Sequence, residues 1–162
     1  MIGKINDVIR KELMINASQQ RAFQVFTEQM DLWWPRAHHI GKSELKEAVL
    51  ETKPGGRWYE VGVDGTECDW GKVLVWNPPH QLVLAWQITA EWQYDPNFLT
   101  EVEVNFIEKG PKLTSFTLEH RNIEKFGAQA EEIWSAFDSE GGWTGMLKSF
   151  ATLAETEAAG RE

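Results

Sequence analysis

The fold of this chain is decided by one stretch, TEVEVNFIEKGPKLTSFTLEH, which spans residues 100–120. Polar and apolar residues alternate in both halves of the stretch, and Lys109-Gly110-Pro111 separates the halves. A period of two is typical of strands with one buried face, and turn residues between two such runs predict a hairpin. We therefore expect two antiparallel strands, one from Thr100 to Glu108 and one from Lys112 to His120.

Further strands precede this hairpin, and each is bounded by turn residues. They are expected at 44–52, 56–63, 70–76 and 81–89, with turns at Lys53-Pro54-Gly55, Asp64-Gly65 and Asn77-Pro78-Pro79. Short turns of this chemistry connect antiparallel neighbours, and no helical pattern intervenes. One more strand is predicted from Asp7 to Asn16, because Ile9, Leu13 and Ile15 lie there at even spacing. The chain is therefore expected to form a continuous antiparallel sheet.

Helices are predicted on both sides of this run of strands. Ser18 is a suitable N-cap for a short helix after the first strand, and Leu32-Trp33-Trp34 begins a second short turn. After His120 the apolar period becomes helical over 126–137 and again, for a longer helix, from Trp143. The long helix needs a surface for its apolar stripe, and the concave face of the sheet is the available one. An α+β fold follows, with a curved antiparallel sheet wrapped around a long C-terminal α-helix and two short helices after the first strand.

Strand phase separates the residues that face the helix from those that face solvent, because alternate residues lie on opposite faces. We expect these to face inward: Gly56, Trp58, Glu60, Leu82, Leu84, Trp86, Ile88, Val102, Val104, Phe106, Thr114, Phe116, Leu118 and His120. Glu101 and Glu103 alternate with inward residues, so they are expected on the solvated face rather than in acid/base chemistry. The space between helix and sheet is the candidate binding site.

Length and charge narrow the classes of partner. With 162 residues, one domain over 1–162 is expected, with its core at about 8–153. The formal net charge is −9 and Lys and Arg form no stripe, which argues against nucleic acid and membrane surfaces. Residues 1–7 carry no apolar segment of a secretory signal, so a cytoplasmic location is expected. A small hydrophobic molecule or another protein, including a second copy in a homodimer, remains.

Nine tryptophans exceed what a core of this size needs, and this favours an aromatic cavity wall or an interface. We favour the cavity. Trp58, Trp86 and Trp143 are expected to converge on it, whereas Trp70 and one of Trp33 and Trp34 are expected to pin turns and sheet ends. Trp76, Trp92 and Trp134 have no assigned role.

The order of the motifs resembles the START-like (SRPBCC) superfamily, over about Val8 to Leu153. The motifs are Ile15-Asn16-Ala17-Ser18, Trp33-Trp34-Pro35, Pro54-Gly55-Gly56-Arg57-Trp58, Trp70-Gly71-Lys72-Val73, Asn77-Pro78-Pro79, Leu84-Ala85-Trp86, Leu118-Glu119-His120 and Gly141-Gly142-Trp143. The chain is most similar to the branch named for activators of heat-shock-protein-90 ATPase. The resemblance implies a helix-grip fold around a deep apolar pocket, in members that range from lipid carriers to polyketide cyclases and co-chaperone domains. The aromatic 90–99 link and the helix near 124–137 depart from the plainer members.

The candidate ligand-binding residues are the inward aromatic residues together with two inward ionisable residues. They are Trp34, Trp58, Glu60, Trp86, Phe106, Phe116, His120 and Trp143. A buried carboxylate has its pKa raised unless a cation pairs with it, so Glu60 and His120 could act as acid and base. The alternative is that backbone groups or Arg57 satisfy Glu60 and that His120 marks the end of its strand. We assign no residue a catalytic role on this basis.

Metal and cofactor chemistry is not expected. His38-His39 lacks the spacing of a metal motif, and Cys68 is the chain's sole cysteine. One of the two histidines is a candidate for the pocket mouth. Cys68 is interpreted as a small residue near a turn rather than a nucleophile.

Three functions are compatible with these patterns. The first is binding of a small hydrophobic or aromatic ligand in a deep cavity between the sheet and the C-terminal helix. The second is a cyclase or dehydratase that uses the same cavity, with Glu60 and His120 moving protons. The third is a co-chaperone-like or homodimeric interaction module that uses the 90–99 link as its apolar surface.

Overall fold

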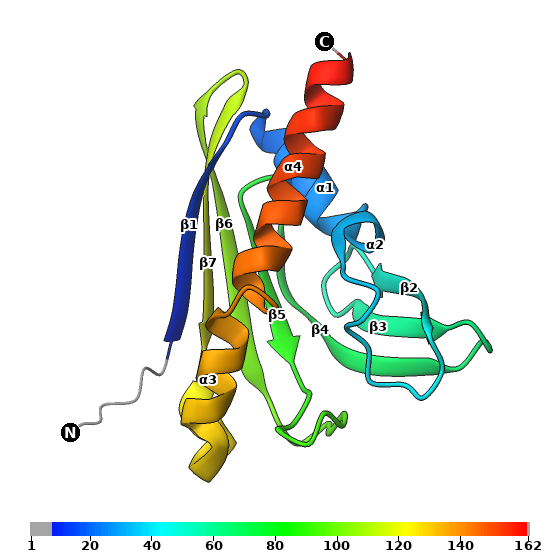
Figure 1. Cartoon of the computed structure of the whole chain (residues 1–162). Coiled ribbons are helices and arrows are strands. Elements are labelled where there is room, and N and C mark those ends of the chain that lie inside the picture. Colours follow the sequence, from blue (N-terminus) through cyan, green and yellow to red (C-terminus); the bar gives the residue numbers. More distant parts are fainter. Residues whose placement is uncertain (1–7, 162) are drawn as a thin grey trace.

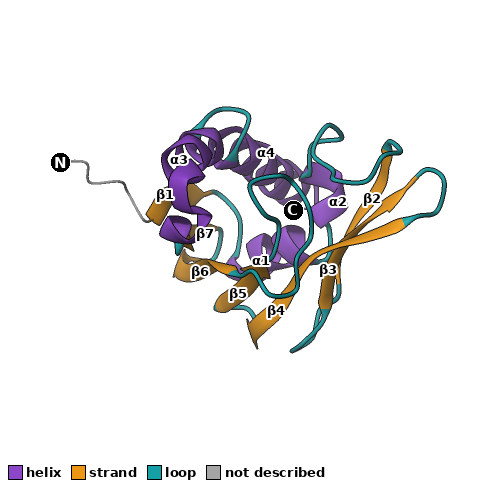
Figure 2. Ribbon diagram, turned by 90° about the horizontal axis from the view of Figure 1, so that it is seen from below, coloured by secondary structure: helices purple, strands orange, loops and turns teal. Residues whose placement is uncertain are grey.

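A computed structural model describes residues 8–161, with the side chains of residues 8–156. Seven antiparallel strands form one sheet in the order β1-β7-β6-β5-β4-β3-β2. The strands are β1 (Val8–Ile15), β2 (Leu45–Leu50), β3 (Arg57–Gly62), β4 (Glu67–Asn77), β5 (Gln81–Trp86), β6 (Thr100–Gly110) and β7 (Leu113–Arg121). The sheet curls around the helices, as the view along it shows (Figure 2). Residues 1–7, on which the expectation of no secretory signal rests, lie outside the described part.

The predicted hairpin forms β6 and β7, which take part in the longest strand pairings of the sheet. Phe106 of β6 pairs with Phe116 of β7, and β1 adds to the other side of β7 with Leu13 opposite Phe116. The residues that were predicted to face inward lie on β3, β5, β6 and β7 or next to them, and all of them are buried. The alternation in the sequence therefore identified the concave face correctly.

The helices lie on the concave face of the sheet (Figure 1). They are α1 (Gln19–Thr27), α2 (Met30–Trp33), the 3-10 helix η1 (Ile123–Gln129), α3 (Ala130–Asp138) and α4 (Trp143–Arg161). Ser18 caps α1 as predicted, because its hydroxyl accepts the Arg21 amide at 3.0 Å. The sequence predicted one helix from Phe126, but Gly127 has φ +67° and ψ −130°, so the chain turns there before α3 begins. The helix-grip α+β fold is confirmed.

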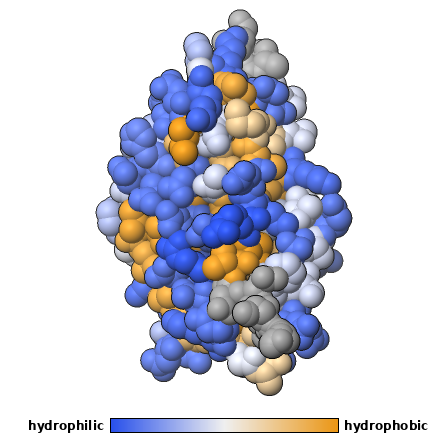
Figure 3. All heavy atoms as spheres, turned by 90° about the vertical axis from the view of Figure 1, so that its left-hand side faces the viewer, coloured by the Kyte–Doolittle hydropathy of each residue, from blue (hydrophilic) through white to orange (hydrophobic). Residues whose placement is uncertain are grey.

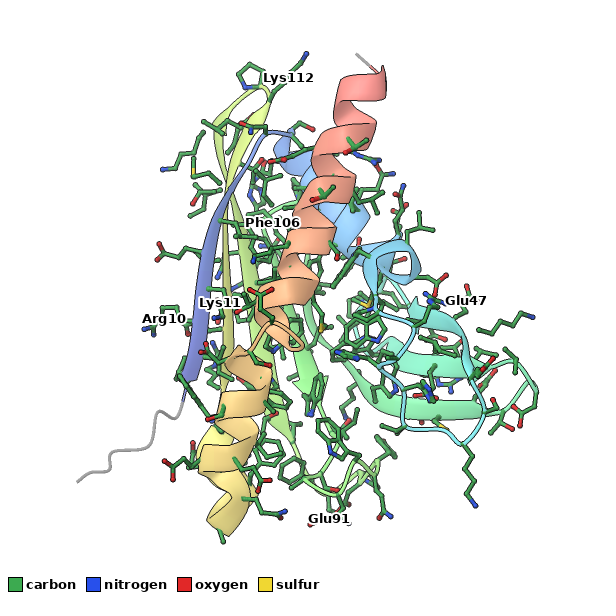
Figure 4. All side chains as sticks on the ribbon, in the orientation of Figure 1. Arg10, Lys11, Glu47, Glu91, Phe106 and Lys112 are labelled. Atoms are coloured by element: carbon green, nitrogen blue, oxygen red, sulfur yellow. The ribbon has the colours of Figure 1, made fainter. Side chains whose placement is uncertain are left out.

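The upper half of the space between α4 and the sheet is filled by phenylalanine side chains. Phe150 of α4 packs edge-on against Phe26 at 5.2 Å between ring centroids and lies 5.1 Å from Phe116. Phe106, on β6, lies 5.2 Å from Phe116 and is 1% exposed (Figure 4). This half of the layer is a closed core.

A β-bulge interrupts the pairing of β3 with β4. Trp58 pairs with Gly71 and Tyr59 pairs with Asp69, which leaves Trp70 as the extra residue. A bulge turns its strand locally and redirects a side chain. Trp70 and Gly71 are accordingly both buried, although they are consecutive. The bulge explains why Trp70 does not occupy the sheet-end position expected from the sequence.

The two sides of β1 differ in the way that its alternation predicts. Arg10 points away from the helices and pairs with Glu119 at 2.8 Å, whereas Lys11 lies on the helix side and its Nζ is 2.7 Å from Asp138 (Figure 4). Seen from this edge, the surface is largely hydrophilic with apolar side chains in separate groups (Figure 3). Within residues 8–161, no helix is both long enough and apolar enough to span a membrane.

Candidate functional site

A pocket of about 450 Å³ opens beside the N-terminal end of α4, below the phenylalanine core. Its wall comes from the loop after α2, from β4 and β5, from the 90–99 link, and from the end of α3, the turn after it and the start of α4. Five indoles contribute to it: Trp34, Trp70, Trp86, Trp92 and Trp143. Phe137, Ile88 and Met146 add further apolar surface, and His38, His39 and Ser139 add polar side chains. The pocket is therefore mainly aromatic.

The four buried indoles of this wall pack on one another. Trp34 stacks on Trp70 with ring centroids 4.8 Å apart, and Trp143 lies edge-on to Trp34 at 6.4 Å and to Trp86 at 6.3 Å. Trp58 lies behind them, 0% exposed and edge-on to Trp34, Trp70 and Trp86. Edge-to-face contacts of this kind stabilise aromatic clusters and hold each ring in place.

Each of the four buried indole N–H groups is bonded to the protein. The bonds run from Trp34 to the His38 carbonyl at 2.9 Å, from Trp70 to Glu60 Oε1 at 2.7 Å, from Trp86 to the Ile88 carbonyl at 3.1 Å, and from Trp143 to His120 Nδ1 at 3.1 Å. A tryptophan has one polar hydrogen, and these bonds use it. The four rings therefore offer a ligand apolar surface and no further donor.

Glu60 is 1% exposed, and its carboxylate accepts three N–H donors. Oε1 accepts the Ile40 amide and the Trp70 indole, both at 2.7 Å, and Oε2 accepts the Gly41 amide at 2.8 Å. Multiple N–H donors are what allow a carboxylate to be buried in the absence of water. Glu60 thus joins the 40–41 loop to β3 and β4, behind the pocket wall.

His120 is fully buried, and its hydrogen bonds specify its tautomer. Because the Trp143 indole can only donate, His120 Nδ1 is the acceptor, and Nε2 therefore carries the hydrogen toward Thr100 Oγ1 at 2.8 Å. Thr100 in turn donates to the Trp86 carbonyl at 3.4 Å. Burial lowers the pKa of His120 from 6.5 to about 3. His120 is a neutral link that fixes Trp143, and its ring stacks on Phe137 at 4.7 Å.

Both histidines of the loop after α2 contribute to the pocket lining. His38 Nε2 donates to the Gly141 carbonyl at 2.6 Å and joins the loop to the turn before α4. His39 Nδ1 donates to the Gly41 carbonyl at 2.9 Å. Adjacent residues of a strand would point apart, but residues 38–40 form no strand, so both rings reach the same pocket.

The 90–99 link contributes one side of the pocket mouth. Trp92, which is 49% exposed, lines the pocket and lies edge-on to Phe137 at 6.4 Å. Its φ of +62° is rare for a bulky residue and is the kind of backbone feature that often accompanies a functional site. The link therefore places an indole at the pocket mouth.

The predicted site residues divide into three groups. Trp34, Trp86 and Trp143 line the pocket; Trp58, Glu60 and His120 lie behind the wall; and Phe106 and Phe116 belong to the phenylalanine core. Glu60 and His120 contact different indoles, so the structure does not bring them together as an acid and base pair. The sequence did not assign Trp70, Trp92 or Phe137 to the lining. It offered one of His38 and His39 for the pocket mouth, on the basis of their position beside the Trp33-Trp34-Pro35 turn, and both line the pocket.

Among the described residues, no group of three or more His, Cys, Asp or Glu side chains is arranged to hold a metal ion.

Comparison with known proteins finds relatives that share this architecture. The family model described as Activator of Hsp90 ATPase homolog 1-like protein matches residues 16–155. The chain is 35% identical in sequence to an anthrahydroquino-γ-pyrone synthase, Txn09, whose structure is known. The match covers 94% of this chain and 99% of that chain, with a TM-score of 0.66. CalC, a self-sacrificing resistance protein from Micromonospora echinospora, is 27% identical over 94% of this chain and 96% of that one, with a TM-score of 0.70.

A more distant structure, protein NE0264 from Nitrosomonas europaea, shares the fold at 13% identity, with 93% of this chain and 95% of that chain covered and a TM-score of 0.64. No curated protein matches the chain.

Proposed function

Because the chain belongs to the family of Activator of Hsp90 ATPase homolog 1-like proteins, whose fold it has, we propose that it binds a planar, aromatic small molecule in the indole-walled pocket. The observation that carries the proposal is the wall itself. Trp34, Trp70, Trp86 and Trp143 have their N–H groups bonded to the protein, so what they offer a ligand is ring surface. Such a pocket is selective for flat apolar molecules.

Preorganisation supports the same proposal. The wall indoles pack on one another and are held by Glu60, His120 and two carbonyl groups, so ligand binding requires little ordering of side chains. Ordering costs subtract directly from affinity, and a wall that is already ordered avoids them. The pocket volume of about 450 Å³ is within the range typical of small-molecule sites.

Fluorescence quenching tests this proposal. Anthraquinone-2-sulfonate should quench tryptophan emission in a saturable manner, because its electron-accepting anthraquinone ring would stack against several indoles. Ala136→Phe should weaken binding at least about tenfold, since residue 136 lines the pocket and a phenyl group would occupy it. Ala128→Phe, at an exposed position of η1, is the matched control and should bind as the unmodified protein does. Equal affinities for the two variants, or no saturable quenching, would contradict the proposal.

A second candidate function is catalysis of ring closure in the same pocket. It is favoured by one observation, the 35% identity over nearly the whole chain to a structure described as a pyrone synthase. Because Glu60 and His120 are occupied behind the wall, proton transfer would require a side chain that lines the pocket. Conversion of an anthrahydroquinone precursor, followed by mass spectrometry, would separate this function from binding alone.

A further inference from the structure

The pocket has few polar atoms that are free to meet a ligand. The N–H groups of the four buried wall indoles are used, and the Ser139 hydroxyl donates to the Ala136 carbonyl at 2.7 Å. His38 and His39 remain as the ionisable side chains of the lining. Whatever polar group a ligand carries, the two imidazoles are the side chains best placed to recognise it.

The two imidazoles present different nitrogens. His38 commits its distal nitrogen, Nε2, to the Gly141 carbonyl, which leaves Nδ1, close to the backbone. His39 commits Nδ1 to the Gly41 carbonyl, which can only accept, so the ring carries its hydrogen on Nδ1 when neutral. The distal nitrogen of His39, Nε2, is then a hydrogen-bond acceptor, and among the described side chains, those of residues 8–156, none donates a hydrogen bond to it.

The loop that carries His39 is held rigidly. The Gly41 carbonyl that accepts from His39 belongs to the residue whose amide donates to Glu60 Oε2, and the Ile40 amide donates to Oε1. A side chain at position 41 would place its Cβ 2.8 Å from Glu60 Oε2 and 3.2 Å from Cys68 Sγ, so glycine permits this close approach. Bonds in series polarise one another, which strengthens the support of the imidazole.

A negative charge lies close to the loop that carries His39. Glu60 places a buried carboxylate beneath residues 40 and 41. Cys68, packed against the same loop, is not a competing proton donor, because burial and the nearby charge of Glu60 raise the pKa of its thiol. His38, the adjacent ionisable residue, is tethered to Gly141.

We propose that His39 Nε2 accepts the proton of a phenolic or enolic hydroxyl on the aromatic ligand, an inference that rests on the proposed function and adds the ligand's chemical class to it. In this step the O–H bond of the ligand breaks and an N–H bond forms on His39. The products are a phenolate or enolate in the pocket and an imidazolium. The aromatic wall binds the ring, and His39 selects rings that carry an acidic hydroxyl.

Two dyes that differ in their hydroxyl groups test this inference. The first is 1,2-dihydroxyanthraquinone, whose visible absorption shifts when a phenol ionises, and the second is 1,2-dimethoxyanthraquinone, which cannot ionise. The protein should bind the dihydroxy dye at least about tenfold more tightly than the dimethoxy dye. The pH midpoint of the dye's ionisation should fall by roughly one unit or more on binding, since an opposite charge within contact distance stabilises the phenolate.

Variants assign the effect to one residue. His39→Phe keeps an aromatic ring and should remove both the preference and the midpoint shift; His39→Gln keeps a hydrogen-bonding group and should remove the shift alone. His80→Phe, at an exposed position after β4, is the control and should change neither. His39→Gln also decides the matter if His39→Phe does not fold.

The outcomes separate this inference from the proposed function. The role assigned to His39 is wrong if both dyes bind equally. It is also wrong if the midpoint shift persists in both His39 variants, or if the shift disappears only in His38→Phe. In each of these cases the binding function stands. If neither dye binds, the binding function is wrong, and the role of His39 falls with it.

Discussion

Glu60 illustrates how a buried charge can be used to build a pocket wall instead of reacting in it. Its three N–H partners come from the 40–41 loop and from Trp70. The carboxylate therefore determines the position of an indole and of the loop that carries His39.

The change Glu60→Gln tests that structural role. A glutamine has one acceptor oxygen, and its amide nitrogen would face an N–H group, so at least one buried donor loses its partner. We expect the free energy of unfolding to fall by about 3 kcal/mol, because hydrogen bonds to charged groups contribute about 1.5–3 kcal/mol each. Urea denaturation measures it. Glu47→Gln, at an exposed position of β2, is the control, and an equal effect of the two changes would count against the role of Glu60.

His120 predicts a specific dependence of stability on pH. Its pKa is about 3 in the folded state and 6.5 when exposed, so below pH 6.5 the unfolded chain binds a proton that the folded chain does not. The stability that this residue contributes is therefore complete above pH 6.5 and is lost as the pH falls toward 3. The loss amounts to about 1.4 kcal/mol per pH unit at most.

Urea denaturation between pH 6 and pH 4.5 measures this slope. His120→Asn keeps an acceptor for the Trp143 indole and cannot titrate, so its stability should fall less steeply with decreasing pH. His80→Asn replaces an exposed histidine and should keep the original slope. An unchanged slope in His120→Asn would show that burial does not lower the pKa of His120.

The link from 90 to 99 is more ordered than a loop of its length requires. Ile88 pairs with Tyr94, and the Asp95 amide donates to the Gln87 carbonyl at 2.9 Å. The Trp92 amide donates to the Thr89 carbonyl at 2.9 Å, within a tight turn that imposes the positive φ on Trp92. This turn places the indole at the pocket mouth at a backbone cost of about 1–2 kcal/mol.

Replacing Trp92 separates the strain from the contact. Trp92→Gly relieves the backbone and Trp92→Ala does not, so the glycine variant should be more stable than the alanine variant by about 1 kcal/mol. Both should bind anthraquinone-2-sulfonate about tenfold more weakly than the unmodified protein, because both lose the indole. Gel filtration in parallel distinguishes a pocket lid from an interaction surface: an altered elution volume would favour the homodimer or partner interface.

The whole molecule is held together by the contact of α4 with the curved sheet. Phe150 is 0% exposed and contacts Phe26, Trp33 and Phe116. These residues come from α1, α2 and β7, so one side chain joins the helices to the sheet. The expectation of one domain over the chain predicts that loss of this contact affects every element together.

Phe150→Ala should lower the free energy of unfolding by about 3–5 kcal/mol, the usual cost of a large buried cavity. Met14→Ala, on β1 and 55% exposed, is the control and should change it by less than about 1 kcal/mol. Circular dichroism and tryptophan fluorescence should report the same single transition for both variants. Separate transitions would contradict a single cooperative domain.

Periodicity alone was sufficient to predict the sheet, its concave face and the long helix. The alternation over 100–120 identified Val104, Phe106, Phe116 and Leu118 as buried, since a period of two assigns residues to faces without reference to any distant segment. The start of α1 was predicted for a similar reason, because a cap such as Ser18 acts on the turn that follows it. By the same parity, Glu60 and His120 were placed on the inner face, where both are buried.

Tertiary structure decided which of these inner residues reach open space. Phe106 and Trp86 share an inner face, but Phe106 is enclosed by other phenylalanines and Trp86 borders the pocket. Periodicity assigns a residue to a face and does not indicate its position along that face. The bulge that turns Trp70 inward depends on pairing between two strands, and the path of His39 depends on Glu60, about 20 residues away. Local patterns encode local geometry and burial, whereas a pocket is created by contacts between segments that are distant in sequence.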